Sequence, residues 1–275
     1  MKAITKFLTT TPLTALFGIF VLIFFLMIGI FAPAIAPYGE TEIVGDQYEV
    51  WSEAFLLGTD NLGRDILSRL MYGTRNTVGI ALLTTCITFV IGTFFGMISA
   101  ALGRLVDQVM CRIVDVLMAI PSLISALLLL TILGTSIPVL VGVISLLEAT
   151  RVFRLARSVS MNVIVQDYVE VARLRGESIW YVLVKEVLPN ILAPLAAEFG
   201  LRFCYVFLFI SALSFLGLGI QPPTADWGSM VRENAALISF GDITPLLPAF
   251  AIALLTISVN YIVDWFLHKA SGLKN

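Results

Sequence analysis

Three long runs of the chain contain no charged residue, and they constrain the fold more than any other feature. The runs cover residues 7–39, 76–103 and 116–147. A helix needs about 20 mostly apolar residues to cross a bilayer core of about 30 Å. The whole chain is 59% hydrophobic and 13% charged, whereas ordinary soluble domains are about 25% charged. The sequence therefore predicts an all-α integral membrane protein.

These runs indicate six membrane spans. The third run is too long for one helix, and Gly134 and Pro138 interrupt it, since glycine and proline mark turns. Two further apolar segments are present. One follows Pro189, and the other begins near Pro245. The predicted spans cover residues 13–36, 76–103, 110–133, 138–156, 191–217 and 245–267. The last five spans and their connections form one core over residues 76–267.

The first apolar run has an alternative interpretation as a signal peptide. Lys2 and Lys6 precede it, and residues 34–36 read Ala-Ile-Ala, which imitates a cleavage site. The apolar part of a signal peptide is about 7–15 residues long, however, and this run is much longer. We therefore favour a retained membrane span over residues 13–36.

Basic residues are unequally distributed between the two sides of the predicted core. If the N-terminus is cytoplasmic, the outer loops hold only four basic residues, which are Arg64, Arg69, Arg75 and Arg232. Basic loops favour the cytoplasmic side, so the terminal segments 1–12 and 268–275 are both predicted to be cytoplasmic. The connections long enough to carry structure are the outer segments 37–75 and 218–244 and the cytoplasmic segment 157–190.

The cytoplasmic segment has the pattern of two short helices joined at a bend. Asp167 suits the first turn of a helix, where a carboxylate meets the positive end of the helix dipole. Gly176 suits the left-handed residue that ends such a helix. Apolar residues then recur at helical spacing over 179–187, and Pro189 suits the start of the next helix. We expect Ala172 to be exposed and to insert into a groove of a partner. The alternative is a merely solvated loop helix.

This segment resembles the E-A-A…G…L-P coupling motif of permease subunits of binding-protein-dependent ABC importers. The motif positions would be filled by Glu170, Val171, Ala172, Gly176, Leu188 and Pro189. The family usually has alanine where this chain has Val171, and this departure bears on the tightness of one contact. The resemblance implies that the segment contacts an ATPase subunit.

Two further stretches resemble the dipeptide, oligopeptide and nickel branch of these permeases, in its C-type subunits. The first is similar to the L-G-T-D-x-x-G-R-D signature and the second to a G-L-G-x-x-P-P…W-G element. The signature residues are Gly58, Thr59, Asp60, Gly63, Arg64 and Asp65 in the first stretch and Pro222, Pro223, Trp227 and Gly228 in the second. Both stretches lie in the predicted outer segments.

The residues of the outer stretches also allow an interpretation without the family. Asp60, Arg64 and Asp65 can offset one another's charge, and the helix that follows them has an apolar side suited to the outer interface. Pro222 and Pro223 stiffen the second stretch, while Trp227 suits the headgroup level. A docking surface for an external protein and an interfacial anchor both remain open.

Two features lie within the predicted spans. Glu198 and Arg202 are four residues apart and can pair on one helix face, either on the translocation pathway or as a structural pair. Gly92, Gly96 and Ala100 place small residues on one face of the second span, which permits close helix packing. We favour packing within the subunit over a subunit interface.

Several classes of function are disfavoured. The chain has no G-x-x-x-x-G-K-[ST] loop, so we expect it not to bind ATP and not to be an enzyme. Its three cysteines and single histidine form no metal-ligand pattern, so no metal site and no cofactor are expected in this chain. With 17 basic and 19 acidic residues, no nucleic-acid partner is expected.

The resemblance implies the type I ABC importer permease fold and a multi-pass location in the bacterial inner membrane. Its implied partners are a sister permease subunit in a heterodimer, two ATP-binding subunits that carry ATP and Mg, an external substrate-binding protein and membrane lipid. The chain would form half of a translocation pathway for peptides or similar small solutes, and the sequence leaves the exact substrate open. The alternative is a secondary transporter or channel that works without ATPases.

Overall fold

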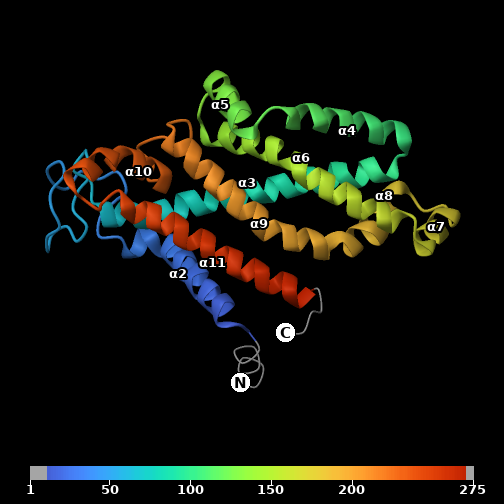
Figure 1. The fold of residues 1–275 in the computed structure, drawn as a ribbon, viewed down its shortest axis with the longest axis horizontal. Coiled ribbons are helices and arrows are strands. Elements are labelled where there is room, and N and C mark those ends of the chain that lie inside the picture. Colours follow the sequence, from blue (N-terminus) through green and yellow to red (C-terminus); the bar gives the residue numbers. More distant parts are fainter. Residues whose placement is uncertain (1–10, 271–275) are drawn as a thin grey trace. The chain divides into compact units, whose positions relative to one another are not determined.

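The computed structural model describes residues 11–270, which are mostly helical (Figure 1). The elements in chain order are α2 (Leu13–Ile35), α3 (Ile66–Ala101), α4 (Arg104–Ala119), α5 (Ser122–Leu133), α6 (Ile137–Ile164), α7 (Asp167–Leu174), α8 (Ile179–Tyr181), a π-helical turn (Val182–Val187), α9 (Leu188–Phe215), α10 (Trp227–Asn234), a 3₁₀ turn (Ala235–Phe240) and α11 (Leu246–Ala270). Among these residues the β pairing is limited to isolated bridges before α3. The all-α prediction is confirmed. Most of the predicted cytoplasmic segment 1–12, and residues 271–275 of the other, lie outside the described residues.

Four helical stretches are long and apolar enough to cross a membrane. They are Leu13–Ile35, Ile66–Ala101, Ile179–Phe215 and Leu246–Lys269. The bent pair α4 and α5 makes a fifth span if it is counted as one. Helix α6 is not among them, because Glu148, Arg151 and Arg154 interrupt its apolar sequence. The six-span count is therefore not confirmed and stays a prediction.

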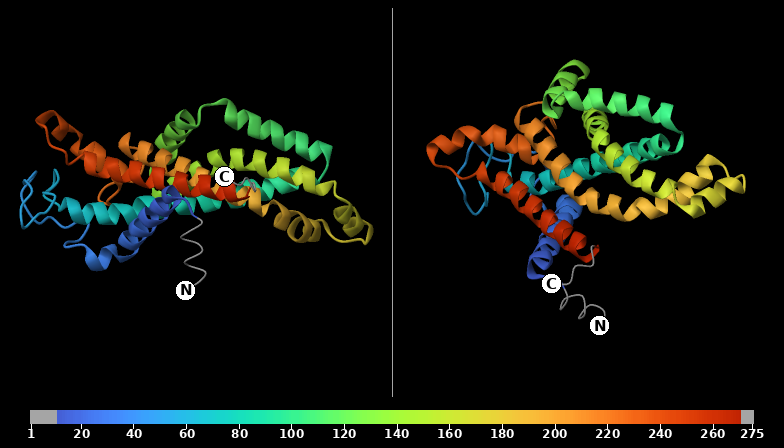
Figure 2. Two further views of the ribbon diagram at one scale, coloured as in Figure 1. Left: turned by 60° about the horizontal axis from the view of Figure 1, so that its bottom comes forward. Right: turned by 45° about the vertical axis from the view of Figure 1, so that its right-hand side comes forward.

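The third predicted span, residues 110–133, is not one helix. Helix α4 ends at Ala119, α5 begins at Ser122, and the two axes differ by 86° (Figure 2). Ile120 between them is extended, with ψ at 133°. Proline disfavours the helical conformation in the residue before it, and it has no N–H to donate. Pro121 thus explains a break that the continuous apolar run concealed.

The separate interfacial helix predicted in segment 37–75 is also absent. The residues from Ile66 onward form the first part of α3, which continues without interruption to Ala101. Asp65 caps this helix, since the backbone N–H of Ser68 donates to its carboxylate at 2.8 Å and the Ser68 hydroxyl at 2.6 Å. The predicted boundary near Asn76 contains no residue that ends a helix, so the two predicted helices merge.

The described residues form two compact units. Unit 1 contains residues 11–82, 135–137 and 203–270, and unit 2 contains residues 83–134 and 138–202. In unit 1, α2 packs along α11, and α10 also contacts α11 (Figure 1). Unit 1 therefore joins the first and last membrane helices described.

In unit 2, small residues let the second part of α3 approach α6 closely. A Cβ atom on Gly92 would lie 2.6 Å from the Cβ of Val152, and one on Gly96 would lie 2.8 Å from the Cβ of Ala156. Any larger side chain at either glycine would force the helices apart. The preference for packing within the subunit is confirmed for these two glycines.

Candidate functional site

The bend predicted in segment 157–190 is present. Helix α7 runs from Asp167 to Leu174, and Gly176 has a φ of +80°. The Gly176 N–H donates to the carbonyl of Arg173 at 2.9 Å, and the Glu177 N–H donates to that of Ala172 at 3.2 Å. This left-handed glycine satisfies the last carbonyls of α7 and reverses the chain.

The second helix of the segment is not separate from the next span, which corrects the prediction. Helix α8 continues through the π-helical turn into α9, so helical residues run from Ile179 to Phe215. The N–H of Leu188 donates to the carbonyl of Leu183, five residues back. Pro189 directly follows this wider turn, and it has no N–H to contribute to the hydrogen bonds of the helix. Pro189 is therefore inside a continuous helix, and Leu188 is half-buried beside it.

Ala172 is completely buried, so the expectation that it inserts into a partner's groove is wrong. It belongs to an apolar cluster of unit 2. The cluster comprises Met97, Val152, Ala156, Val169, Ala172, Val182, Leu183, Val187, Ile191 and Leu195. Because α3, α6 and α9 all contribute to this cluster, α7 is packed against the helices of unit 2. A small side chain at position 172 lets α7 pack closely.

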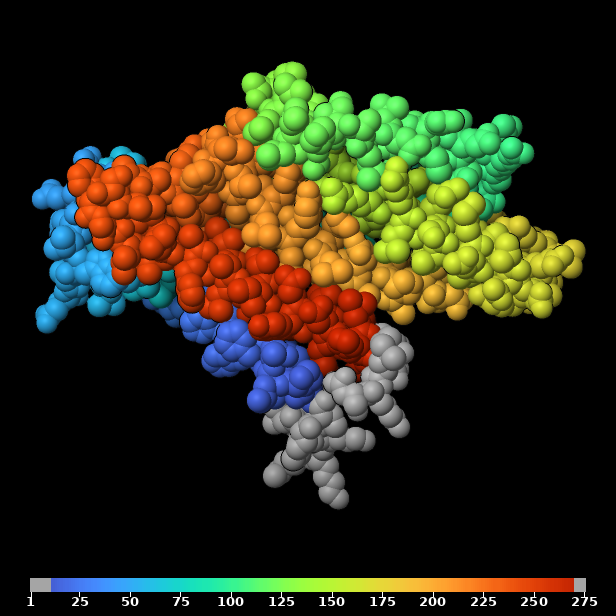
Figure 3. All heavy atoms as spheres, viewed as in Figure 1, coloured from blue at the N-terminus to red at the C-terminus, as the bar shows by residue number. Residues whose placement is uncertain are grey.

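The opposite side of α7 is exposed and partly apolar. Tyr168, Val171 and Leu174 follow one another at three-residue spacing, with 43%, 52% and 80% of their surfaces exposed. We call these three residues the coupling face. Glu170 and Gly176 are exposed as well, and the segment, yellow in Figure 3, is uncovered on the face shown. Within the motif, Val171 rather than Ala172 is the apolar residue that a partner can reach.

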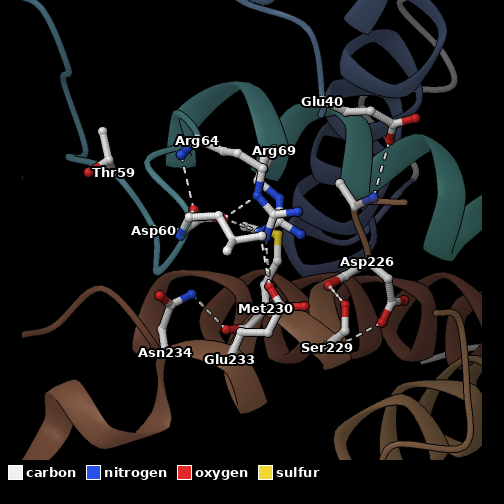
Figure 4. A network of polar contacts seen from close by, with 12 residues as sticks. Glu40, Thr59, Asp60, Arg64, Arg69, Asp226, Ser229, Met230, Glu233 and Asn234 are labelled. Carbon is white, nitrogen blue, oxygen red and sulfur yellow. Dashed lines mark hydrogen bonds and ion pairs between the residues drawn. The ribbon is translucent and has the colours of Figure 1, made fainter. Parts of the chain in front are cut away.

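The first outer stretch contributes to a buried network of charges in unit 1 (Figure 4). Arg64 Nε donates to a carboxylate oxygen of Asp60 at 2.7 Å, and Arg69 donates to the same oxygen. Both arginines also contact Glu233 of α10, with nitrogen–oxygen distances of 3.2 and 3.0 Å. We call these four residues the outer charge network. Each member has an oppositely charged partner, and all but Glu233 are at most 2% exposed.

The network differs from the predicted charge grouping in its members. Asp65 caps α3 and has no ion pair among the described residues. Arg69 and Glu233 are members that the sequence did not reveal. Burial acts to raise the pKa of Asp60, but a hydrogen bond from the Arg64 N–H and the charge of Arg69 outweigh it and leave this pKa below its ordinary value of 3.8. Asp60 is therefore a carboxylate that these partners hold ionised.

The other residues of the first signature shape the loop around this network. Gly58 and Gly63 have φ values of +74° and +76°. The Thr59 hydroxyl donates to the carbonyl of Asp46 at 2.6 Å and accepts from the N–H of Glu49 at 2.8 Å. All three signature residues are buried, so they serve the structure of segment 37–75.

Trp227 is buried, which contradicts its predicted place at the headgroup level. Its indole N–H donates to the carbonyl of Leu70 at 3.0 Å, and its ring contacts Phe25 and Phe207 edge-on at centroid distances of 5.3 and 6.1 Å. Gly228 beside it is also buried. Trp227 therefore joins α2, α3 and α9 to α10 within unit 1.

Pro222 and Pro223 are exposed, unlike the rest of the second signature. After them, Asp226 caps α10 by accepting from the Ser229 N–H at 2.8 Å, and it accepts from the Thr77 hydroxyl at 2.9 Å. Burial raises the pKa of Asp226, although these hydrogen bonds counter the shift. The exposed prolines thus lie on a stretch that is anchored at its end.

The predicted pair in the fifth span is confirmed as a contact, and it has a third member. Arg202 donates to the carboxylate of Glu198. Arg202 Nη1 donates to Glu148 Oε2 at 3.2 Å. Glu148 comes from α6 and is fully buried. The sequence alone does not connect Glu148 with this pair, because 54 residues separate it from Arg202.

The chain is similar to known transport proteins. Residues 89–269 match the family described as "Binding-protein-dependent transport system inner membrane component". The dipeptide transport system permease protein DppC of Haemophilus influenzae is 32% identical over 257 residues, which cover 91% of this chain and 87% of that protein. The DppC protein of Escherichia coli is 35% identical, with coverages of 91% and 86%.

Two further comparisons extend this result. The peptide transport system permease protein SapC of Haemophilus influenzae is 34% identical over 264 residues, which cover 93% of this chain and 89% of that protein. A crystal structure of an amino acid ABC transporter with histidines has a TM-score of 0.55 at 15% identity and covers 74% of this chain and 94% of that one. This likeness supports the predicted permease fold. The chain belongs to the family of inner-membrane components of binding-protein-dependent transport systems.

Proposed function

We propose that the chain forms half of the translocation pathway of an ATP-driven importer and admits peptides or similar small solutes that an external binding protein delivers. Relatives named as dipeptide and peptide permeases, 32% to 35% identical over more than nine-tenths of the chain, support the substrate class. The exposed coupling face on α7 is the single observation that carries the ATP-driven part.

The proposed complex contains a sister permease subunit, two ATP-binding subunits that carry ATP and Mg, and the binding protein outside. We place it in the inner membrane of a bacterium, with both termini of this chain in the cytoplasm. The distribution of basic residues supports this orientation, since Arg173, Arg175 and Lys185 lie in segment 157–190, which carries the coupling face.

ATP-driven closure of the ATP-binding subunits moves α7 in this proposal. Glu170 and Val171 contact the partner, and Gly176 keeps α7 at its angle. The following helix is continuous through Leu188 and Pro189 to Phe215, so a displacement near α7 is carried along its length. The pathway then alternates between its two sides because ATP and the binding protein favour different states.

In the outer segments, we propose that the exposed Pro222 and Pro223 belong to the surface that meets the binding protein. The outer charge network supports this role only indirectly, because its members are buried and position segment 37–75 against α10.

Copurification and uptake test the proposal. In mild detergent, the tagged chain is expected to retain the two ATP-binding subunits and the sister permease. In proteoliposomes, the complete complex with its binding protein is expected to accumulate radiolabelled alanyl-alanine only when ATP is enclosed on the cytoplasmic side. Uptake by this chain alone, independent of ATP, would instead support the secondary transporter.

A further inference from the structure

A small cavity lies at the break between α4 and α5 in unit 2. Its volume is about 100 Å³. One wall is the break itself, from Ile120 to Ser122, and the opposite wall is a face of α6 that includes Glu148 and Arg151. Figure 2 shows the sharp change of direction between α4 and α5. The cavity therefore combines a broken helix with ionisable side chains.

Glu148 is the unusual member of this cavity. Its side chain is 0% exposed, and its Oε2 accepts from Arg202 at 3.2 Å and lies 3.9 Å from Arg151 Nε. The second oxygen, Oε1, is inaccessible to solvent and has no hydrogen-bond partner among the described residues. A buried carboxylate oxygen without a donor is strongly unfavourable. Since the nearby arginines use Oε2, Oε1 is suited to a donor that the chain itself does not supply.

The broken helix favours the same kind of ligand. The last turn of α4 ends beside the cavity, and the last carbonyls of a helix lack partners within it. Secondary transporters use such interrupted helices in the membrane to hold substrates and ions, with carbonyls directed at cations. Ile120 and Glu148 both line the cavity, so the free carbonyls at the end of α4 and Glu148 Oε1 are the acceptors that a hydrogen-bond donor there would use.

We propose that this cavity binds the amino group of the transported solute and that the Glu148 side chain turns so that Oε1, which is enclosed in this structure, accepts its hydrogen bond. The inference rests on the proposed function, because it assigns recognition of one end of a peptide-like solute to this chain. Selectivity for solutes with a free amino group then resides partly in the permease and not only in the external binding protein.

A labelling experiment tests the cavity without any assumption about the solute. Ser122→Cys is introduced into the complete complex after serine replaces the three native cysteines. The rates of its reaction with a cationic and an anionic methanethiosulfonate reagent are then compared.

Glu148→Gln is expected to lower the ratio of cationic to anionic rate about tenfold, and Glu148→Asp, which keeps the charge, is expected to preserve it. Asp115→Asn is the control, because Asp115 of α4 forms an exposed ion pair with Arg154 of α6 and does not line the cavity. An unchanged ratio in Glu148→Gln would overturn the proposal.

A transport experiment separates this inference from the proposed function. In proteoliposomes with the binding protein, Glu148→Gln is expected to slow uptake of alanyl-alanine at least tenfold, and Asp115→Asn is expected to leave it unchanged. If wild-type uptake is normal and Glu148→Gln matches it, the inference fails and the proposed function stands. If the wild-type complex takes up no dipeptide but the labelling ratio depends on Glu148, the proposed function fails and the cation-binding cavity stands.

Discussion

The outer charge network and the coupling face both include residues from stretches that resemble family signatures, but the side chains of the network are buried and those of the coupling face are exposed. In the network, Asp60, Arg64 and Arg69 are buried and neutralise one another together with Glu233. On the coupling face, Val171 and Leu174 leave more than half of their surface exposed. The network therefore stabilises one subunit, whereas in the proposed function a partner subunit covers the coupling face. Substitutions in the two regions are expected to separate stability from transport.

The largest expected effect is on stability, in the network. Arg69→Ala removes a positive partner of both Asp60 and Glu233, so two carboxylates lose part of their compensation inside the protein. Breaking a buried ion pair from one side costs about 3–5 kcal/mol. The midpoint of thermal unfolding in detergent, read by size-exclusion chromatography, is expected to fall by several degrees at least.

The control for this substitution is Arg175→Ala. The Arg175 side chain is 57% exposed, and its nearest carboxylate oxygen, on Glu177, is 3.8 Å away. Exposed pairs contribute about 0–1 kcal/mol, so little change is expected. Equal midpoints for both variants would contradict the structural role of the network.

An intermediate effect is expected at the buried side of α7. Ala172→Leu adds three carbon atoms to a position that is 0% exposed, and overpacking of this kind costs about 1–3 kcal/mol. Thermal unfolding of the purified chain is the measurement. Val171→Leu is the matched control one residue away, because Val171 is 52% exposed and can accept the extra carbon. A destabilised Val171→Leu and an unaffected Ala172→Leu would reverse the assignment of the two sides.

A smaller effect concerns pH. The folded-state pKa of Asp60 is lowered from 3.8, so its ionisation stabilises the folded state above the unfolded pKa, and this contribution is lost as pH falls through the folded pKa. The difference in unfolding midpoint between wild type and Asp60→Asn is expected to be constant from about pH 7 to pH 5 and to shrink below about pH 4. A difference that grows as the pH falls would contradict the lowered pKa.

Local chemistry was sufficient to predict some of these features and insufficient for others. Gly176 ends α7 as predicted, because the left-handed conformation depends on glycine itself and on carbonyls one turn away. The burial of Ala172 depends on α3, α6 and α9, whose packing no local pattern reveals. Glu233 meets Arg69 across 164 positions of sequence, and a pairing at that distance requires the fold.

Among the membrane helices, too, local sequence predicts some features, whereas others depend on the fold. The apolar runs located α2 and α11 to within a few residues, since length and hydrophobicity are properties of the segment alone. The break at Pro121 was missed because the residues on both sides are equally apolar. A proline inside an apolar run is compatible with a kink or a full break, and the surrounding helices decide between them.

The central claim is that the exposed side of α7 receives the ATP-binding subunits, and Val171→Glu tests it most directly. Val171 is 52% exposed, so the substitution is expected to change the free energy of unfolding of the isolated chain by no more than about 0.5 kcal/mol. ATP-dependent uptake of alanyl-alanine by the reconstituted complex is expected to fall at least tenfold. Wild-type uptake by a Val171→Glu complex would contradict the claim.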